Sequence, residues 1–316
     1  MNICERRTKQ PEYWFVLGAV CLIAVLFYGI RAAAVLGLAA VTAVLTDFFC
    51  LFLQGRAYRT ADLSNAAAAV VMALMFPATI PYSIVMLSTV FMVAVGIHAF
   101  GSRGNYLFPP AAAGYLFALI SWKHEVLQFP EAGGQLALFG NQAERVPSLS
   151  QTIFTERMLR VDLLDLLMGA VASPMGTGSI LLLTIGLLVM ICRRNVSYWA
   201  VFGFLTGLSV LSMFGQLPAS LFLSANMLLF SLIFLLGDLS ALLKGSLSLL
   251  CAGTVTGMLT WYFLEHLQLE YGVVIAVLLT SPLWHLLASA EARMQQKREQ
   301  RAALSAAADA EMGENA

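Results

Sequence analysis

The sequence predicts an all-α polytopic membrane protein with about ten transmembrane helices, and its composition carries this prediction. Of the 316 residues, 59% are apolar and only 11% are charged, whereas soluble domains have roughly 45–50% apolar and about 25% charged residues. The mean hydropathy is +0.80. This apolar excess is too large for a core to bury, which excludes a soluble enzyme, a nucleic-acid-binding protein and a disordered chain. The net charge of 0 implies no overall attraction to an acidic partner.

Long apolar runs follow one another without alternating with polar residues, so they predict helices and not strands. A helix needs about 20 apolar residues to cross the hydrocarbon core. Ten runs approach that length: 13–30, 32–54, 64–79, 82–100, 108–122, 179–192, 196–214, 218–236, 245–264 and 271–289. The third, fifth and sixth are short, which predicts re-entrant or half-length elements. No small-residue cleavage site follows the polar N-terminus, so we interpret the first run as a membrane helix and not a signal peptide.

The basic residues predict the orientation, because cytoplasmic loops carry an excess of Lys and Arg. Ten spans with a cytoplasmic N-terminus place 13 basic residues inside and 5 outside. The five outside are Arg31, Lys123, Arg145, Arg157 and Arg160. We therefore expect a multi-pass protein of the cell inner (cytoplasmic) membrane with both termini in the cytoplasm.

This topology divides the chain into five segments. Residues 1–12 form a cytoplasmic N-terminal segment, and residues 290–316 form an Ala-rich cytoplasmic tail that we expect to fray from a helix by Glu314. Two membrane halves, 13–122 and 179–289, flank an extracytoplasmic loop at 123–178. So long a loop in a protein of short loops is more often functional than idle. Pseudo-symmetric halves are common in membrane proteins, although these two share no evident sequence match.

Four ionisable residues lie within or at the ends of apolar runs, where such groups are rare and often functional. Asp47 and Asp238 lie near predicted cytoplasmic ends, where a carboxylate can also simply reach water. Asp62 comes just before Ser64 and equally fits a helix N-cap. His98 is a candidate proton carrier or an interfacial histidine with ordinary hydrogen bonds.

Small residues gather at two connections and make them candidate ligand sites. Gly101, Gly104 and Phe108 lie between the fourth and fifth runs, and residues 169–179 precede the sixth run. Glycines let a backbone approach a ligand, and helix N-termini bind anions such as phosphate. A helix start after a loop also commonly carries Gly and Ser, so an ordinary structural role stays open.

No motif of a soluble enzyme is present: the sequence lacks a Walker loop, a nucleophile elbow, a zincin helix and a dinucleotide fingerprint. The five cysteines are scattered without paired spacing, and we interpret them as small buried hydrophobic residues and not as metal ligands. The four histidines lack the spacing of membrane haem ligands. The sequence therefore predicts no catalytic residue, and any redox chemistry would belong to a bound cofactor or a partner.

Several landmarks occur in the order of a known family. They are Tyr28-Gly29-Ile30-Arg31, Asp62 with Ser64, Ala73-Leu74-Met75-Phe76-Pro77, Phe100-Gly101 with Gly104, Phe108 and Pro110-Ala111, Ile120-Ser121-Trp122, and Gly272-Val273 through Val277-Leu278-Leu279. From about Tyr28 to Ala288 the chain resembles a divergent member of the RnfD family. The members of this family are membrane components of the Rnf electron-transport complex. RnfD is similar to NqrB, a membrane component of the sodium-translocating NADH:quinone reductase.

The resemblance implies a flavin mononucleotide (FMN) joined through its phosphate to a threonine, in a motif close to Ser-Gly-Ala-Thr. The matching residues here are Met168-Gly169-Ala170-Val171, and valine has no hydroxyl to form a phosphoester. We therefore expect no covalent flavin at Val171, with a non-covalent flavin left as an alternative. The cofactor-binding residues that the resemblance implies are Gly169, Ala170, Val171, Gly176, Thr177, Ser179, Asp62, Gly101, Gly104 and Phe108.

Three functions remain open at this point. The resemblance implies a membrane subunit of an Rnf-like, ion-translocating complex that conducts electrons from ferredoxin to NAD. Its expected partners are other Rnf-like subunits and membrane lipid, and no nucleic acid. Because Tyr106, Pro109 and Thr177 replace polar residues of the family, a scaffold subunit of another membrane flavoprotein electron-transfer system is the second function. A small-molecule transporter on the same helices is the third.

Overall fold

The computed structural model describes residues 10–55, 63–102, 105–130, 136–138, 145–146, 148–156, 162–215 and 227–314, and this part of the chain is mostly helical. The apolar runs of the first half form α2 (Pro11–Tyr28), α3 (Ile30–Leu53), α4 (Ser64–Leu74), α5 (Tyr82–Phe91), the π-helix η1 (Met92–Ala99) and α6 (Pro110–Ser121). Gly29 separates α2 from α3 with a φ of 72°, a left-handed conformation that glycine adopts at little cost.

The segment between the halves contains short elements. They are α7 (Lys123–Val126), β3 (Phe129–Pro130), β4 (Arg145–Val146), α8 (Leu149–Glu156) and α9 (Leu163–Met168). β3 pairs with β4 in an antiparallel ribbon. A second antiparallel ribbon, β1 (Gly101–Ser102) with β2 (Asn105–Tyr106), connects η1 to α6. The second half contains α10 (Ile180–Cys192), α11 (Tyr198–Ser212), α13 (Leu228–Ser240), α14 (Ser246–Glu265) and α15 (Gly272–Glu314).

Ten apolar helices in the described part of the chain lie on the ten predicted runs. Five are long and apolar enough to cross a membrane: α2, α3, the continuous helix of α5 and η1, α14, and Gly272–Lys297 of α15. Five are shorter: α4, α6, α10, α11 and α13. The protein is therefore an all-α, multi-pass membrane protein, and the predicted short third, fifth and sixth helices are short.

One helix boundary and the lengths of two helices differ from the prediction. The eighth run was expected at 218–236, but the described helix α13 begins at Leu228 and ends at Ser240. Met227 before it has a φ of 69°, which cannot continue a helix. The second difference is that α11 and α13 are also short helices. In the tail the backbone stays helical within α15 as far as Glu314.

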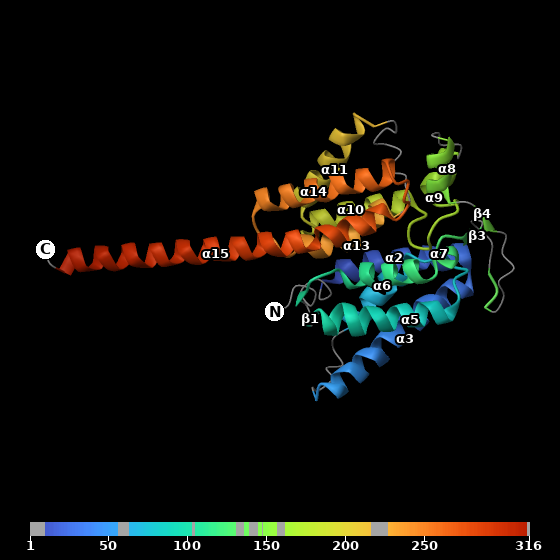
Figure 1. The fold of residues 1–316 in the computed structure, drawn as a ribbon, viewed down its shortest axis with the longest axis horizontal. Helices are drawn as coiled ribbons and strands as arrows, with labels where there is room; N and C mark the ends of the chain where they lie inside the picture. Colours follow the sequence, from blue (N-terminus) through green and yellow to red (C-terminus); the bar gives the residue numbers. More distant parts are fainter. Residues whose placement is uncertain are drawn as a thin grey trace.

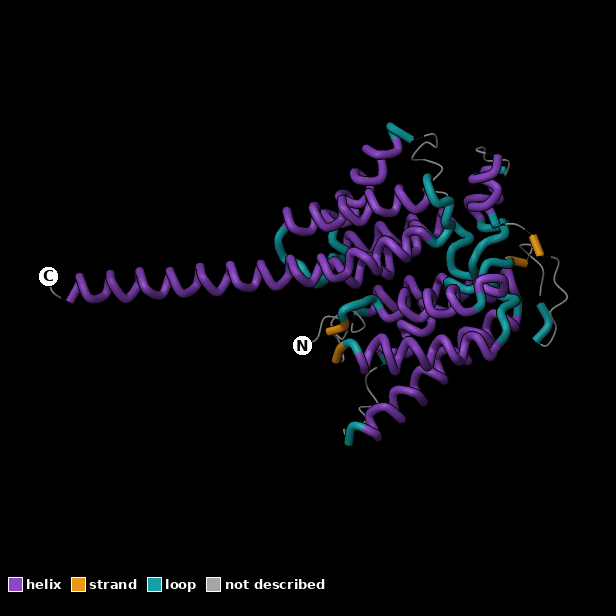
Figure 2. Tube along the Cα trace, viewed as in Figure 1, coloured by secondary structure: helices purple, strands orange, loops and turns teal. Residues whose placement is uncertain are grey.

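The helices of each half lie together, and helices of the two halves are in contact (Figure 1). α2 contacts α10, and α6 contacts α15. The short elements α7, α8, α9, β3 and β4 gather at one end of the helices, whereas β1 and the projecting part of α15 lie at the other (Figures 1 and 2). The connection that contains Gly169 is therefore at the opposite end from the connection that contains Gly101.

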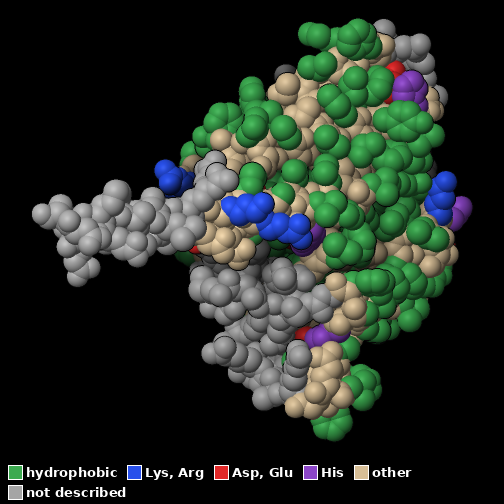
Figure 3. All heavy atoms as spheres, turned by 60° about the vertical axis from the view of Figure 1, so that its left-hand side comes forward, with side chains coloured by type: hydrophobic (Ala, Val, Ile, Leu, Met, Phe, Trp, Pro, Cys, Tyr) green, Lys and Arg blue, Asp and Glu red, His purple; other side chains and the backbone are tan. Residues whose placement is uncertain are grey.

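Apolar side chains cover much of the outer surface, as Figure 3 shows for one face. Phe15, Leu26 and Leu286 are 74%, 66% and 66% exposed, respectively. Other faces of the same helices are buried, for example at Val20 on α2 and Trp284 on α15. Helices that are apolar on both their inner and outer faces are typical of proteins whose solvent is lipid.

α11 and α14 pack with almost no space between their backbones. A Cβ atom on Gly203 would lie 2.4 Å from the carbonyl oxygen of Leu250, and one on Gly257 would lie 2.1 Å from that of Phe204. These glycines belong to two motifs of the form Gly-x-x-x-Gly, Gly203–Gly207 and Gly253–Gly257. Such motifs let transmembrane helices approach closely, and the rising residue numbers on both helices show that they run parallel.

Candidate functional site

The connection from α9 to α10, residues 169–179, brings together six of the ten predicted cofactor-binding residues. It begins at Gly169, which ends α9 with a φ of 98° and donates its N–H to the carbonyl oxygen of Asp165 at 2.8 Å. A Cβ atom there would lie 2.8 Å from the nitrogen of Ser179. Only glycine satisfies both the left-handed φ and this close approach. The two ends of the connection are therefore held against each other.

The middle of this connection is bound to the first half of the protein by its backbone. The N–H of Met175 donates to the carbonyl oxygen of Phe76 at 3.1 Å, and the N–H of Gly176 donates to that of Leu74 at 2.8 Å. A Cβ atom on Gly176 would lie 2.7 Å from Cβ of Leu74 and 3.0 Å from Cε2 of Phe230. Gly176 thus lies where the end of α4 meets the beginning of α13.

The hydroxyl groups of this connection already have partners. Ser179 is the N-cap of α10: its Oγ accepts from the N–H of Leu182 at 3.3 Å and donates to the carbonyl oxygen of Leu167 at 3.0 Å. Thr177 Oγ1 donates to the carbonyl oxygen of Pro174 at 3.2 Å. These contacts are those of a capped helix start, which the sequence had left open as the ordinary alternative to a ligand site.

Val171 is buried in an apolar cluster. Its side chain is 6% exposed and packs with Leu149, Ile153 and Leu166 in a small apolar cluster beneath α8 and α9. The neighbouring Ala170 is exposed. The position that corresponds to the family's threonine therefore has neither a hydroxyl nor access to a ligand.

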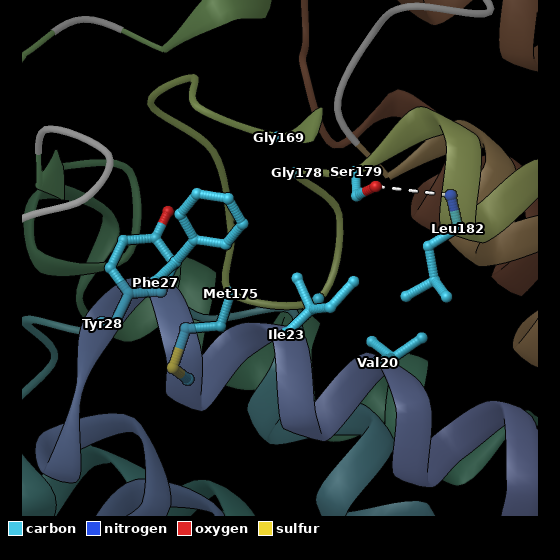
Figure 4. A pocket seen from close by; sticks show the side chains of 10 residues that line it. Val20, Ile23, Phe27, Tyr28, Gly169, Met175, Gly178, Ser179 and Leu182 are labelled. Carbon is cyan, nitrogen blue, oxygen red and sulfur yellow. Dashed lines mark hydrogen bonds between the residues drawn. The ribbon is translucent and has the colours of Figure 1, made fainter. Parts of the chain in front are cut away.

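A small pocket lies between this connection and α2 (Figure 4). α2 contributes Val20, Ile23 and Phe27, which are aliphatic or aromatic, together with Tyr28. The Tyr28 hydroxyl donates to the carbonyl oxygen of Ser173 at 3.1 Å. Sequence reasoning missed the α2 residues, because an apolar residue that lines a pocket has the same sequence pattern as one that fills a core.

A bound flavin mononucleotide does not fit the residues of this pocket. Its phosphate would need cationic side chains or several unpaired N–H donors, whereas the lining residues are Val20, Ile23, Phe27, Tyr28, Gly169, Met175, Gly176, Gly178, Ser179 and Leu182. The two hydroxyls among them, on Tyr28 and Ser179, already donate to backbone carbonyls. The enclosed space, about 10 Å³, is also only large enough for a water molecule.

The other predicted site residues lie elsewhere. Gly101 pairs with Tyr106 in the β1–β2 ribbon, and the half-buried Phe108 meets Phe100 edge to face with ring centroids 6.3 Å apart. Both are at the far end of the helices from Gly169 (Figure 1). Asp62 and Gly104 lie outside the described residues. The N-cap of α4 is Leu63, without a side-chain cap.

Comparison with known proteins gives one family and a set of partial relatives. The profile of the NQR2, RnfD, RnfE family matches residues 6–295. The D subunit of the ion-translocating oxidoreductase complex of Pectobacterium atrosepticum is 32% identical over 122 residues, which cover 37% of this chain and 35% of that protein. The protein of the same name from Pseudomonas paraeruginosa is 27% identical over 166 residues, or 48% of each chain. The chain thus spans between about a third and a half of the length of these curated relatives.

Proposed function

Because this chain belongs to the NQR2, RnfD, RnfE family, we propose that it is an RnfD-type membrane component of an ion-translocating oxidoreductase complex. The observation that carries the proposal is the family match over residues 6–295, which includes the membrane helices from α2 to α14 completely and α15 as far as residue 295. The names of the relatives support it, since each is called a subunit of such a complex. The proposed partners are accordingly sister membrane subunits.

The proposed direction of electron flow is from reduced ferredoxin toward NAD, as the resemblance to the Rnf complex implies. In this proposal no flavin is esterified to the chain at position 171. Two observations support that part: valine has no hydroxyl, and the Val171 side chain is packed against Leu149 and Leu166. The cofactors that carry electrons past this subunit then belong to its partners.

We further propose an inner-membrane location with both termini in the cytoplasm. Exposed cations support the orientation, because Arg193, Arg194 and Lys244 lie in the connections that the ten-span topology assigns to the cytoplasm. On this arrangement α7, α8 and α9 are extracytoplasmic. The α9–α10 connection then enters the protein from the extracytoplasmic side.

One observation favours a second candidate function, a scaffold subunit of another membrane flavoprotein electron-transfer system. The Gly169–Ser179 connection has the close backbone approaches that only its glycines allow. The hydroxyls of Thr177 and Ser179 are bonded to backbone carbonyl oxygens. A scaffold would retain this fold without holding a cofactor.

Purification of the tagged full chain from its own membranes, in mild detergent, tests the proposal. We expect sister membrane subunits to co-purify and the complex to couple electron transfer between ferredoxin and NAD to ion movement in liposomes. Co-purification of a flavoprotein without ferredoxin or NAD activity would support the scaffold instead. Recovery of the chain alone, with uptake of a small molecule after reconstitution, would overturn both and indicate a transporter.

A further inference from the structure

Asp47 and His98 are 51 positions apart in the sequence, and the fold joins their side chains. Nε2 of His98 lies 2.9 Å from Oδ1 of Asp47. The Asp47 side chain is 2% exposed and the His98 side chain is 10% exposed. Asp47 lies in the candidate membrane span Ile30–Leu53, and His98 lies in the span Tyr82–Ala99. Ionisable groups buried in such segments are costly and usually functional.

A third side chain, Gln54, joins this pair. When Asp47 is ionised its carboxylate only accepts hydrogen bonds, so Nε2 of His98 donates to it. In the neutral ring Nδ1 is then an acceptor, and Nε2 of Gln54, 3.3 Å away, can donate an amide hydrogen to it. The geometry thus has room for a state with neutral His98 beside ionised Asp47. The pair then has a net charge of −1 and one nitrogen that can still bind a proton.

The local backbone brings His98 to this position. Residues Met92–Ala99 form a π-helix, and the N–H of Phe100 donates to the carbonyl oxygen five residues back, on Val95, at 3.2 Å. π-helical turns are rare and occur frequently at functional sites. Gln54 is the C-cap of α3, one residue after the helix ends. All three side chains thus lie at the same end of the helices α3 and α5–η1.

We propose that Asp47 and His98 form a proton-binding site in which Nδ1 of His98 takes up one proton from water. No covalent bond of the protein breaks; the new N–H bond forms on Nδ1, and the pair changes from a charge of −1 to 0. Nδ1–H and the Gln54 amide hydrogens are then both donors, so the amide must turn to present its oxygen. Proton uptake therefore changes the hydrogen bond between His98 and Gln54, the C-cap residue of α3.

The other described ionisable groups on the elements that pack against η1 are few. On α3 the Cys50 thiol is near enough to Asp47 to interact with its charge, and Arg31 is at the opposite end, over the ring of Tyr82 on α5. On α6, Tyr115 is buried against Phe76. The described parts of α4 and β1 add no ionisable side chain.

The role of the site in the complex rests on the proposed function, since an ion-translocating subunit needs a place where an ion binds. The proton binding itself does not, and we would measure it on the isolated full chain in lipid nanodiscs, without redox partners. Isotope-labelled histidine nitrogens report the protonation of each ring by NMR. His98→Gln identifies the His98 signals, and His124→Gln, on the exposed helix α7, is the matched control.

We expect the NMR signals to show His98 protonated only on Nε2 at high pH and on both nitrogens at low pH. Asp47→Asn should bind the proton at least tenfold more weakly, because the imidazolium loses its counter-charge, whereas Asp47→Glu should stay within threefold. A His98 ring that never changes state, or that titrates alike in all these variants, would show a purely structural hydrogen bond.

The two proposals fail independently. A normal proton titration on a chain that recruits no sister subunits would overturn the proposed function and leave the site in place. A complex that assembles and moves ions while His98 keeps one protonation state would overturn the site and leave the proposed function in place.

Discussion

Nε of Arg31 donates a hydrogen bond of 2.8 Å to the carbonyl oxygen of Ala78, 47 positions later in the chain. The same guanidinium donates from Nη2 to the carbonyl oxygens of Thr79 and Ile80, at 3.2 and 3.3 Å. These three carbonyls lie between α4 and α5, where no helical N–H can reach them. In a bilayer, a backbone group without a partner costs several kcal/mol. One buried cation therefore pairs the carbonyls of a connection between two helices.

We predict that Arg31→Met lowers the stability of the protein by about 3 kcal/mol or more, because it leaves up to three carbonyls unpaired at about 1–3 kcal/mol each. Thermal unfolding in detergent, followed by tryptophan fluorescence, measures the change. Arg193→Met is the matched control: its side chain is 66% exposed and only 3.6 Å from Glu12, and exposed ion pairs contribute about 0–1 kcal/mol. Equal effects of the two variants would contradict the role of Arg31.

A second prediction concerns the close contact of α11 with α14. Gly257→Ala would place Cβ 2.1 Å from the carbonyl oxygen of Phe204, so the helices must separate, and overpacking of this kind costs about 1–3 kcal/mol. Gly37→Ala adds the same methyl group to α3 with nothing within 4 Å, and Ala is favoured over Gly inside a helix by about 0.5–1 kcal/mol.

The two glycine variants should therefore shift the unfolding temperature in opposite directions, Gly257→Ala down and Gly37→Ala up. The same fluorescence measurement in detergent detects both shifts. A Gly257→Ala variant as stable as the parent would mean that α11 and α14 are not packed backbone to backbone.

The ten helices could be predicted because hydrocarbon imposes one strong rule: a spanning segment must be apolar and must satisfy its own backbone. The rule does not mark where a helix begins inside a continuous apolar run. The run at 218–236 shows this, since α13 begins at Leu228, directly after the left-handed Met227. The resemblance in motif order was confirmed by the family match.

The candidate site was predictable only in part, because sequence shows which residues lie near each other along a connection but not which connections meet. The residues from Gly169 to Ser179 are contiguous, and in the structure they form one connection between α9 and α10. Gly101 and Phe108 were grouped with them through the resemblance. In the structure they lie at the opposite end of the helices, about the length of the 18-residue helix Tyr82–Ala99 away. Asp47 and His98 were each singled out, but nothing in the sequence indicated that they bond to each other.

A third prediction follows from the packing of Val171. The purified chain should show no flavin fluorescence that survives a denaturing gel, since position 171 has no nucleophilic oxygen. Val171→Thr should also remain unlabelled when a flavin transferase is co-expressed, because the new hydroxyl would lie in the apolar cluster of Leu149, Ile153 and Leu166. Burial of that hydroxyl should also lower stability by about 1–3 kcal/mol.

The control for the flavin experiment is a relative with the family's threonine, expressed with the same transferase. Labelling of Val171→Thr would show that this connection opens to the enzyme, against the packing described here. A fluorescent band on the parent chain would place the attachment on another hydroxyl of the connection, such as Ser173, Thr177 or Ser179.

The fourth prediction tests the orientation with single cysteines in a chain whose five native cysteines are replaced by alanine. A membrane-impermeant thiol reagent should label Lys123→Cys in intact cells, because α7 follows an odd number of spans from a cytoplasmic N-terminus. Arg193→Cys and Lys244→Cys should be labelled only after the cells are permeabilised, since cytoplasmic loops hold the excess of basic residues. All three positions are exposed, so accessibility depends on the membrane alone. Labelling of Lys123→Cys and Arg193→Cys from the same side would mean that α10 does not cross the bilayer.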